Sequence, residues 1–235
     1  MKKYHTLILI ITVICSCNAQ MNLKDYYYPV SSEGYTKVYK YIDKNDATKI
    51  EYWKVISIPE TNTLKTFSYD AECNLYNTFT EVIKKEGAEL IAYSNFEVDS
   101  TGKRKEIKAT VVDKDVYKWN EDNKYSYAVT YTRDYGHVHF KKTRTASGFE
   151  TITIKGEEYE AAKFRDNYIF YFLDHYTRQK FYQDAYYVKS IGMIKYKRKI
   201  PIQDQLIELE LHEILTNDEF EKLKRIKQKN KRKNP

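Results

Sequence analysis

The sequence is poor in cysteine, proline and glycine. Its 235 residues include three cysteines, four prolines and seven glycines. Cys15 and Cys17 fall within the first twenty residues, so Cys73 is the only cysteine in the rest of the chain. A framework of intramolecular disulfides is therefore excluded. With about 215 residues after the leader, the chain is long enough to be stable through one sizeable hydrophobic core.

Signatures of common enzyme classes are also missing. The chain has no nucleophile elbow, no phosphate-binding glycine loop, no His-Glu-x-x-His pattern and no Cys-x-x-Cys pair. Glu157 and Glu158 are adjacent, but in an extended segment their side chains point to opposite faces and cannot act as a paired acid and base. The sequence therefore names no catalytic residue and no cofactor. It favours a protein that is not an enzyme, while an active site built from residues far apart in the chain stays open.

The first twenty residues have the pattern of a secretory signal. Lys2 and Lys3 precede an apolar run from Leu7 to Ile14. This run is too short to cross a bilayer core of about 30 Å, which needs about 20 residues. Residues 1–19 are therefore expected to be a leader that is removed on export. We expect an exported protein that is periplasmic, secreted or an outer-membrane lipoprotein.

Two cleavage sites are open. The segment Ile14-Cys15-Ser16-Cys17 resembles the bacterial lipobox, in which the last cysteine, here Cys17, becomes lipid-modified. Several acyl chains on Cys17 would anchor the protein durably to a membrane. The alternative is the small-x-small pattern Cys17-Asn18-Ala19 before Gln20, which would release a protein without a lipid.

The positive net charge of +7 belongs to one end of the chain. Residues 222–235 contain eight bases and no acid. Removing these eight bases, Lys2 and Lys3 from the total of 40 leaves 30 bases against 33 acids in the body. Nucleic acid is therefore not expected as a partner of the body, and the tail has no interleaved aromatic residue for base stacking. The Lys-rich tail is expected to be a solvated, disordered end or a peripheral contact with anionic lipid headgroups.

Between Tyr26 and His212 the chain has the composition of a long series of β-strands. Tyr, Thr, Val, Ile and Phe dominate, and these residues suit a pleated, half-buried surface. Every glycine except Gly192 falls in the short breaks between the apparent strands. So many strands in succession must curl, because open sheets of this size leave reactive edges. We predict an all-β domain over residues 20–215, a curved antiparallel meander that forms a half-barrel, a barrel or a sandwich.

Residues 71–86 fit two structures. Ala71, Leu75, Phe79 and Val82 are spaced as on one face of a helix. The intervening Tyr76 to Thr80 favours a strand, and the run continues past Gly87 as a hairpin would. The hairpin is the preferred interpretation.

The last twenty residues, 216–235, change character. Thr216-Asn217-Asp218-Glu219 has the pattern of a capping box, and Phe220, Leu223 and Ile226 follow as a narrow apolar stripe. A short helix that dissolves into the Lys-rich tail is expected here.

His137 and His139 are a candidate metal site. As alternate residues they lie on one face of a strand and could share a metal ion, with His175, His212 or a carboxylate completing the site. Such a site would allow a metal-assisted enzyme. Val138 and Phe140 offer the other interpretation, in which they face the core and the two histidines point to solvent.

The chain contains 24 tyrosines, and pairs of them are candidate recognition residues. Tyr27 and Tyr28, and likewise Tyr186 and Tyr187, are the clusters most suggestive of a binding surface. An aromatic ring with a polar tip suits a glycan-binding platform or a wet protein interface. Tyrosine equally suits the structural positions of a half-buried sheet.

Two segments resemble uncharacterised exported β-proteins and lipoproteins of Gram-negative bacteria. Tyr27-Tyr28-Pro29-Val30, followed by residues 34–41, is similar to their opening segment. Residues 191–196, Ile-Gly-Met-Ile-Lys-Tyr, preceded by Tyr186-Tyr187, are similar to their closing strand. The resemblance implies a curved antiparallel sheet in the cell envelope, distantly like half-barrel carriers of lipids or lipoproteins. It supplies no catalytic residue.

The leading hypothesis is therefore a non-enzymatic envelope protein. It would bind an apolar ligand or an envelope protein on its curved sheet. The metal-assisted enzyme around His137 and His139 and the tyrosine-rich glycan-binding module are the alternatives.

Overall fold

The computed structural model describes residues 22–99, 102–120 and 124–233. The leader, with its candidate lipidation residue Cys17 and the alternative cleavage site before Gln20, lies outside these residues. No helix within the described ranges is long and apolar enough to span a membrane.

Strands make up most of the described chain, with short 3-10 turns and one C-terminal helix. In chain order the elements are η1 (Leu23–Tyr26), β1 (Tyr35–Asp43), β2 (Ile50–Ile58), η2 (Pro59–Thr61), β3 (Thr63–Tyr69), β4 (Leu75–Ile83), β5 (Gly87–Val98), β6 (Arg104–Lys108), β7 (Thr110–Lys118), β8 (Tyr125–Arg133), β9 (Gly136–Ile154), β10 (Glu157–Phe172), η3 (Leu173–His175), β11 (Thr177–Val188), β12 (Gly192–Ile200), η4 (Pro201–Gln203), β13 (Gln205–Thr216) and α1 (Asn217–Lys233).

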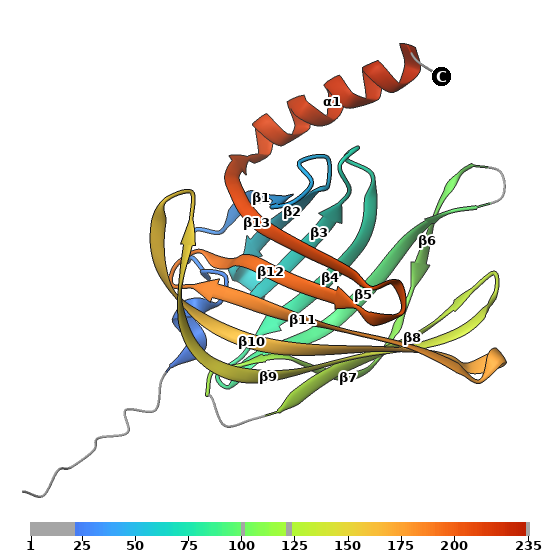
Figure 1. The fold of residues 1–235 in the computed structure, drawn as a ribbon, viewed down its shortest axis with the longest axis horizontal. Helices are drawn as coiled ribbons and strands as arrows, with labels where there is room; N and C mark the ends of the chain where they lie inside the picture. Colours follow the sequence, from blue (N-terminus) through green and yellow to red (C-terminus); the bar gives the residue numbers. More distant parts are fainter. Residues whose placement is uncertain (1–21, 100–101, 121–123, 234–235) are drawn as a thin grey trace, which may run out of the picture.

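The strands form one antiparallel sheet that closes on itself as a barrel (Figure 1). Most neighbours in the sheet are also neighbours in the sequence, as a meander requires. Two long-range pairings complete the ring: β1 with β13, and β7 with the start of β5. Of the described strands, β6 alone is outside the ring, where it pairs with the far half of β5. The predicted all-β fold is confirmed, and the barrel is the correct one of its three forms.

The seam between β5 and β7 depends on a glycine. Gly87 pairs with Lys118, and Ala88 pairs with Tyr117. A Cβ atom at position 87 would lie 2.1 Å from the carbonyl oxygen of Tyr117. Any other residue at position 87 would therefore push the two strands apart.

Residues 71–86 form the predicted hairpin and no helix. Leu75–Ile83 is β4, and it pairs antiparallel with β5 from Asn77 opposite Asn95 to Ile83 opposite Ala88. The preceding turn is fixed by Asp70, whose carboxylate accepts hydrogen bonds from the backbone N–H groups of Glu72 and Asn74. Cys73 is buried in this turn as a free thiol, and burial raises its pKa to about 11.

Alternation along each strand separates an inner face from an outer one. On β1, Tyr39 and Tyr41 belong to the core inside the barrel, whereas Val38 faces outward and packs under α1. This two-residue period is what the pleat of a strand imposes. Alternate residues of each strand therefore face the interior and the exterior of the barrel. Tyrosine is the most common large side chain on the interior face.

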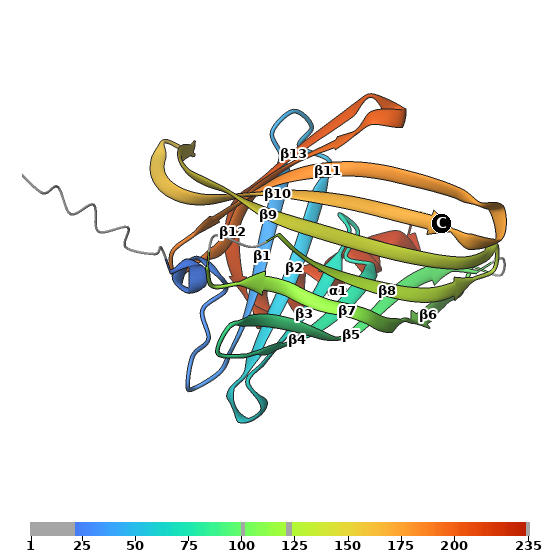
Figure 2. The same cartoon turned by 90° about the horizontal axis from the view of Figure 1, so that it is seen from below.

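The N-terminal segment closes one end of the barrel (Figure 2). The backbone N–H of Leu23 donates to the carbonyl of Trp119 at 2.9 Å, and that of Ser190 donates to the carbonyl of Asp25 at 2.9 Å. Leu23 and Tyr26 are each only 1% exposed. These bonds hold η1 and the tyrosines that follow it against the barrel.

Helix α1 starts as predicted but ends later. The backbone N–H of Thr216 donates to the carboxylate of Glu219 at 2.8 Å, and the Glu219 N–H donates back to the Thr216 hydroxyl at 3.3 Å. This is the predicted capping box. The predicted C-terminal helix is confirmed, and it is longer than expected, because it continues through the basic residues of the tail to Lys233. Lysine, arginine and glutamine are good helix formers, so the basic run can extend the helix once it has started.

Candidate ligand cavity inside the barrel

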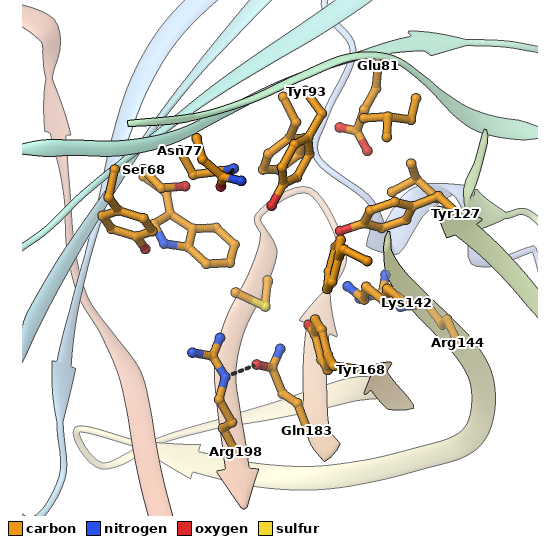
Figure 3. Close-up of a pocket in the computed structure, with 18 of the residues that line it drawn as sticks. Ser68, Asn77, Glu81, Tyr93, Tyr127, Lys142, Arg144, Tyr168, Gln183 and Arg198 are labelled. Atoms are coloured by element: carbon orange, nitrogen blue, oxygen red, sulfur yellow. Dashed lines mark hydrogen bonds between the residues drawn. The ribbon is translucent and has the colours of Figure 1, made fainter. Parts of the chain in front are cut away.

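The barrel interior contains a cavity of about 270 Å³. Aromatic side chains form about half of its lining, and polar and charged side chains interrupt them (Figure 3). The aromatic residues are Tyr27, Tyr28, Trp53, Tyr76, Phe79, Tyr93, Tyr127, Phe140, Tyr168, Phe170, Phe181 and Tyr187. Small-molecule sites are typically of this kind, apolar and aromatic with a few placed polar groups.

The charged residues of the cavity lie at every second position of their strands, where side chains face the barrel interior. On β9, Phe140, Lys142 and Arg144 succeed one another at every second position, and all three line the cavity. Asp166 is directly opposite Arg144 on β10. The same two-residue period brings Gln183 inward on β11.

Asp166 is the centre of a buried ion cluster. It is fully buried and accepts two hydrogen bonds from Arg144, from Nε at 2.6 Å and from Nη2 at 2.7 Å. Lys142 Nζ lies 3.0 Å from the same carboxylate. Burial alone would raise the pKa of Asp166, but the charges of Arg144 and Lys142 hold it below its usual value. Burial, reinforced by Arg144, lowers the pKa of Lys142 to about 8.

The Arg144 side chain is also packed among aromatic rings. Its guanidinium lies 5.1 Å from the ring centroids of Phe164 and Tyr187 and 5.6 Å from that of Tyr117. A guanidinium at such a distance is attracted to the face of the ring. Arg144 is therefore held rigidly by ion pairing and packing together.

Glu81 faces the same part of the cavity without a full set of partners. It is 1% exposed, and its Oε1 atom has no hydrogen-bond partner among the described residues. Burial raises its pKa to about 7, against the opposing effects of Tyr27, Lys142 and Arg144. Within the part of the chain that the structure describes, Asn95 Nδ2 and the Tyr28 hydroxyl, which also line the cavity, likewise have no hydrogen-bond partner. Polar atoms of this kind are normally satisfied by water or by a ligand.

Arg198, on β12, is the third cation of the cavity, and its surroundings differ from those of Lys142 and Arg144. Its Nε donates to the side-chain oxygen of Gln183 at 3.1 Å. The guanidinium lies 4.9 Å from the ring centroid of Tyr196 and 5.5 Å from that of Phe181. Figure 3 shows Arg198 and Gln183 side by side, away from the wall that carries Lys142 and Arg144.

The candidate recognition tyrosines are not on the surface. Tyr27, Tyr28, Tyr186 and Tyr187 are 3%, 6%, 3% and 5% exposed, so their expected surface position is wrong. The reason is that the N-terminal segment folds into the end of the barrel, where Tyr27, Tyr28 and Tyr187 line the cavity. Tyr186 packs on the other side of the wall, with Lys163 lying 5.5 Å from its ring centroid.

The two candidate metal-binding histidines lie on the outer face of the barrel. Val138 and Phe140 face the core, as the alternative interpretation expects. The backbone N–H of His137 donates to Asp174 at 2.9 Å, and its ring nitrogen Nδ1 is 3.1 Å from the same carboxylate. The His139 ring instead packs against Tyr171, at 5.7 Å between centroids. Across the described ranges, no group of three or more His, Cys, Asp or Glu side chains is arranged to hold a metal ion.

Comparisons with known proteins find solved structures that are similar to this one, but they do not assign the chain to a family. No protein-family model matches the chain, and neither does any curated protein. A predicted lipoprotein of Parabacteroides distasonis has a TM-score of 0.47 at 10% identity, over 81% of this chain and 98% of that one. A predicted exported protein with a YmcC-like fold from Bacteroides fragilis has a TM-score of 0.49 at 10% identity, over 81% and 99%.

A third similar structure is that of the hypothetical lipoprotein YmcC from Escherichia coli. It has a TM-score of 0.33 at 11% identity, over 77% of this chain and 86% of that one. All three are exported proteins or lipoproteins by name. This is the kind of protein that the opening and closing segments of the chain resemble.

Proposed function

We propose that this chain is an exported, non-enzymatic binding protein that holds a small, largely aromatic ligand inside its barrel. The observation that carries the proposal is the cavity of about 270 Å³ with its aromatic wall. An apolar protein cavity of about 150 Å³ is large enough to bind benzene. The cavity therefore suits a molecule of one or two rings. The pattern of residues 1–19 supports export.

The proposal is tested with a neutral aromatic probe, 2-naphthol, titrated into the protein without its leader at pH 7. We expect saturable binding of one molecule per chain. Ser68→Phe should weaken it at least tenfold, because Ser68 lines the cavity and is 3% exposed. The control is Ser126→Phe, since Ser126 precedes the cavity-lining Tyr127 on β8 and faces outward. No saturable binding, or equal binding by both variants, would refute the proposal.

We also propose that α1 makes a peripheral contact with an anionic membrane. Phe220 and Leu223 turn toward the barrel, while Lys222, Arg225 and Lys229 are exposed. Ile226, 49% exposed, lies on the same helix. Each basic residue near an anionic surface contributes about 1 kcal/mol of attraction. In Figure 1 the helix projects from the barrel, which leaves its basic surface accessible.

Sedimentation with phosphatidylglycerol vesicles tests this second proposal. The triple variant Lys222→Glu, Arg225→Glu, Lys229→Glu should lose vesicle binding. A control triple, Lys103→Glu, Lys105→Glu, Lys108→Glu, changes the net charge equally at exposed positions on and beside β6 and should keep most of it. Equal losses in the two triples would show a general charge effect and would contradict a role of α1.

A further inference from the structure

We infer that the ligand of the cavity is a neutral aromatic molecule with a hydroxyl group, whose O–H donates a hydrogen bond to the side chain of Glu81. The inference rests on the proposed function and adds the chemical class of the ligand. Two observations carry it: a buried acceptor atom that lacks a donor, and a balance of charges around the cavity.

Glu81 lies on the inner face of β4. Asn77, Phe79 and Glu81 occupy alternate positions of this strand, and all three line the cavity. Glu81 pairs with Leu90 on β5, directly beside a register shift between Thr80 and Glu81. Irregularities of this kind are common beside functional sites, where they redirect a side chain. Figure 3 shows the Glu81 carboxylate directed into the cavity.

The carboxyl group of Glu81 offers a buried acceptor. The residue is 1% exposed, and across the ranges that the structure describes its Oε1 atom accepts no hydrogen bond. A buried oxygen without a donor costs free energy, which a hydrogen bond from a ligand can recover. Burial raises the pKa of Glu81 to about 7, and in either protonation state the group keeps an oxygen that can accept.

The charges around the cavity balance when Glu81 is ionised. Three cations line the cavity: Lys142, Arg144 and Arg198. The charges of three acids act on these cations: Asp166, Glu51 and Glu81. A ligand with a net charge would disturb this balance inside a largely aromatic enclosure, where an unpaired charge is costly. The ligand is therefore expected to be neutral, and a donor to Glu81 favours the ionised form that completes the balance.

An aromatic hydroxyl suits the surroundings of Glu81. Tyr93 and Tyr127 line the cavity on the same side as Glu81 (Figure 3). Burial raises the pKa of Tyr127, and the charge of Glu81 contributes to the rise. A ligand ring packed against these two tyrosines would present its hydroxyl to the carboxylate. A hydrogen bond from a phenolic O–H to an ionised carboxylate is charge-assisted, and such bonds are among the stronger ones in proteins.

The test compares 2-naphthol with 2-fluoronaphthalene, which has nearly the same shape but cannot donate a hydrogen bond. Both are titrated calorimetrically into the protein without its leader at pH 7. We expect 2-naphthol to bind at least tenfold more tightly, since a hydrogen bond to a charged group is worth on the order of a tenfold change in affinity or more. Glu81→Met keeps an unbranched side chain but removes the carboxyl acceptor. It should abolish the preference and leave 2-fluoronaphthalene binding within about threefold of the wild type.

The control variant is Thr80→Val, next to Glu81 on β4. Thr80 lies between the inward-facing positions 79 and 81 and faces the outer side of the barrel, so the preference for 2-naphthol should persist. Equal affinities in the wild type, or a preference that survives Glu81→Met, would overturn the inference. Tighter binding of 2-naphthoate than of 2-naphthol would also overturn it, because the cavity would then select an anion.

The same titrations separate the inference from the proposed function. If 2-fluoronaphthalene or 2-naphthoate binds at least as tightly as 2-naphthol, only the assignment of a hydroxyl donor to Glu81 fails. If none of the three compounds binds, the proposed function itself fails.

Discussion

Gly192 is the residue against which Tyr28 packs. A Cβ atom at position 192 would lie 2.4 Å from Cδ1 of the Tyr28 ring, and the backbone there has a φ of +96°. Position 192 therefore excludes a side chain on two independent grounds. The contact joins the two segments that resemble exported β-proteins, although more than 160 residues separate them.

Gly192→Ala is expected to lower the free energy of unfolding by about 2–4 kcal/mol. About 1–2 kcal/mol comes from the positive φ and the remainder from displacing the Tyr28 ring. Gly156→Ala is the matched control, because its φ is +85° but nothing lies within 4 Å of the added Cβ. Urea unfolding of the two variants separates the contributions. Equal losses would mean that the Tyr28 contact has no energetic cost beyond that of the backbone.

The strand pattern predicts the fold better than it predicts the site. Turn residues and β-forming composition indicate the meander and the hairpin at β4 and β5. Closure requires knowing that Lys37 pairs with Thr216, and no local pattern contains that information. The start of α1 can be predicted from its capping box. Its end cannot, because it lies in a basic run that contains no residue that stops a helix.

The cavity could be predicted only in part. The alternation of Phe140, Lys142 and Arg144 with other residues is visible in the sequence and could have indicated inward-facing charges. The sequence could not identify Asp166 as the partner of Arg144, because their pairing depends on a register shift between Ala162 and Phe164. A shift of one residue moves every side chain to the other face.

Asp166→Asn should cost about 3–5 kcal/mol of unfolding free energy, because it leaves two buried cations without their counterion. The control is Asp184→Asn, on the adjacent strand, whose partner Arg165 has a side chain that is 44% exposed. Breaking an exposed pair of this kind should cost less than about 1 kcal/mol. Guanidinium chloride unfolding of both variants measures the difference.

The pH dependence of the Asp166→Asn effect has a defined sign. The pKa of Asp166 is lowered in the folded protein, so its stabilising contribution is complete above its unfolded pKa of about 3.9. That contribution is lost as the pH falls through the lower, folded pKa. The difference between wild type and variant should therefore be constant from pH 5 to 7 and shrink below about pH 4. A constant difference at all acidic pH values would contradict an ion-pair origin.

The ionisation of Glu81 should change the stability with pH in the direction opposite to that of Asp166. The pKa of Glu81 rises from 4.5 to about 7 on folding, so the folded state binds the proton more tightly than the unfolded state. Stability should therefore fall as the pH rises from about 4.5 to 7, by about 3 kcal/mol in total. Glu81→Gln removes this decline, and the variant should be more stable than the wild type at pH 7.

Urea midpoints at half-unit intervals between pH 4.5 and 7 measure the Glu81 effect. The upper limit avoids the titration of Lys142, whose pKa burial lowers to about 8. Glu157→Gln, at an exposed position at the start of β10, is the control and should follow the wild-type curve. Parallel curves for wild type and Glu81→Gln would rule out a raised pKa at this residue.

The packing of Phe220 should hold α1 against the barrel. It is fully buried, with its ring 5.4 Å from that of Tyr52 and 5.0 Å from that of Tyr69. Phe220→Ala removes these contacts, a loss of about 3 kcal/mol if the site does not collapse. Because Phe220 and Leu223, near the start of α1, supply its apolar contacts with the barrel, the expected result is local release of the helix while the barrel stays folded.

Limited trypsin digestion followed by mass spectrometry detects that release, since α1 is rich in lysine and arginine. Phe220→Ala should be cut within α1 much faster than the wild type, with the barrel fragment surviving intact. Ile226→Ala is the control, because Ile226 is 49% exposed and its loss should leave the rate unchanged. If the two variants are cut at the same rate, the Phe220 contact does not hold the helix, and its attachment must come from ion pairs such as Lys54 with Glu221.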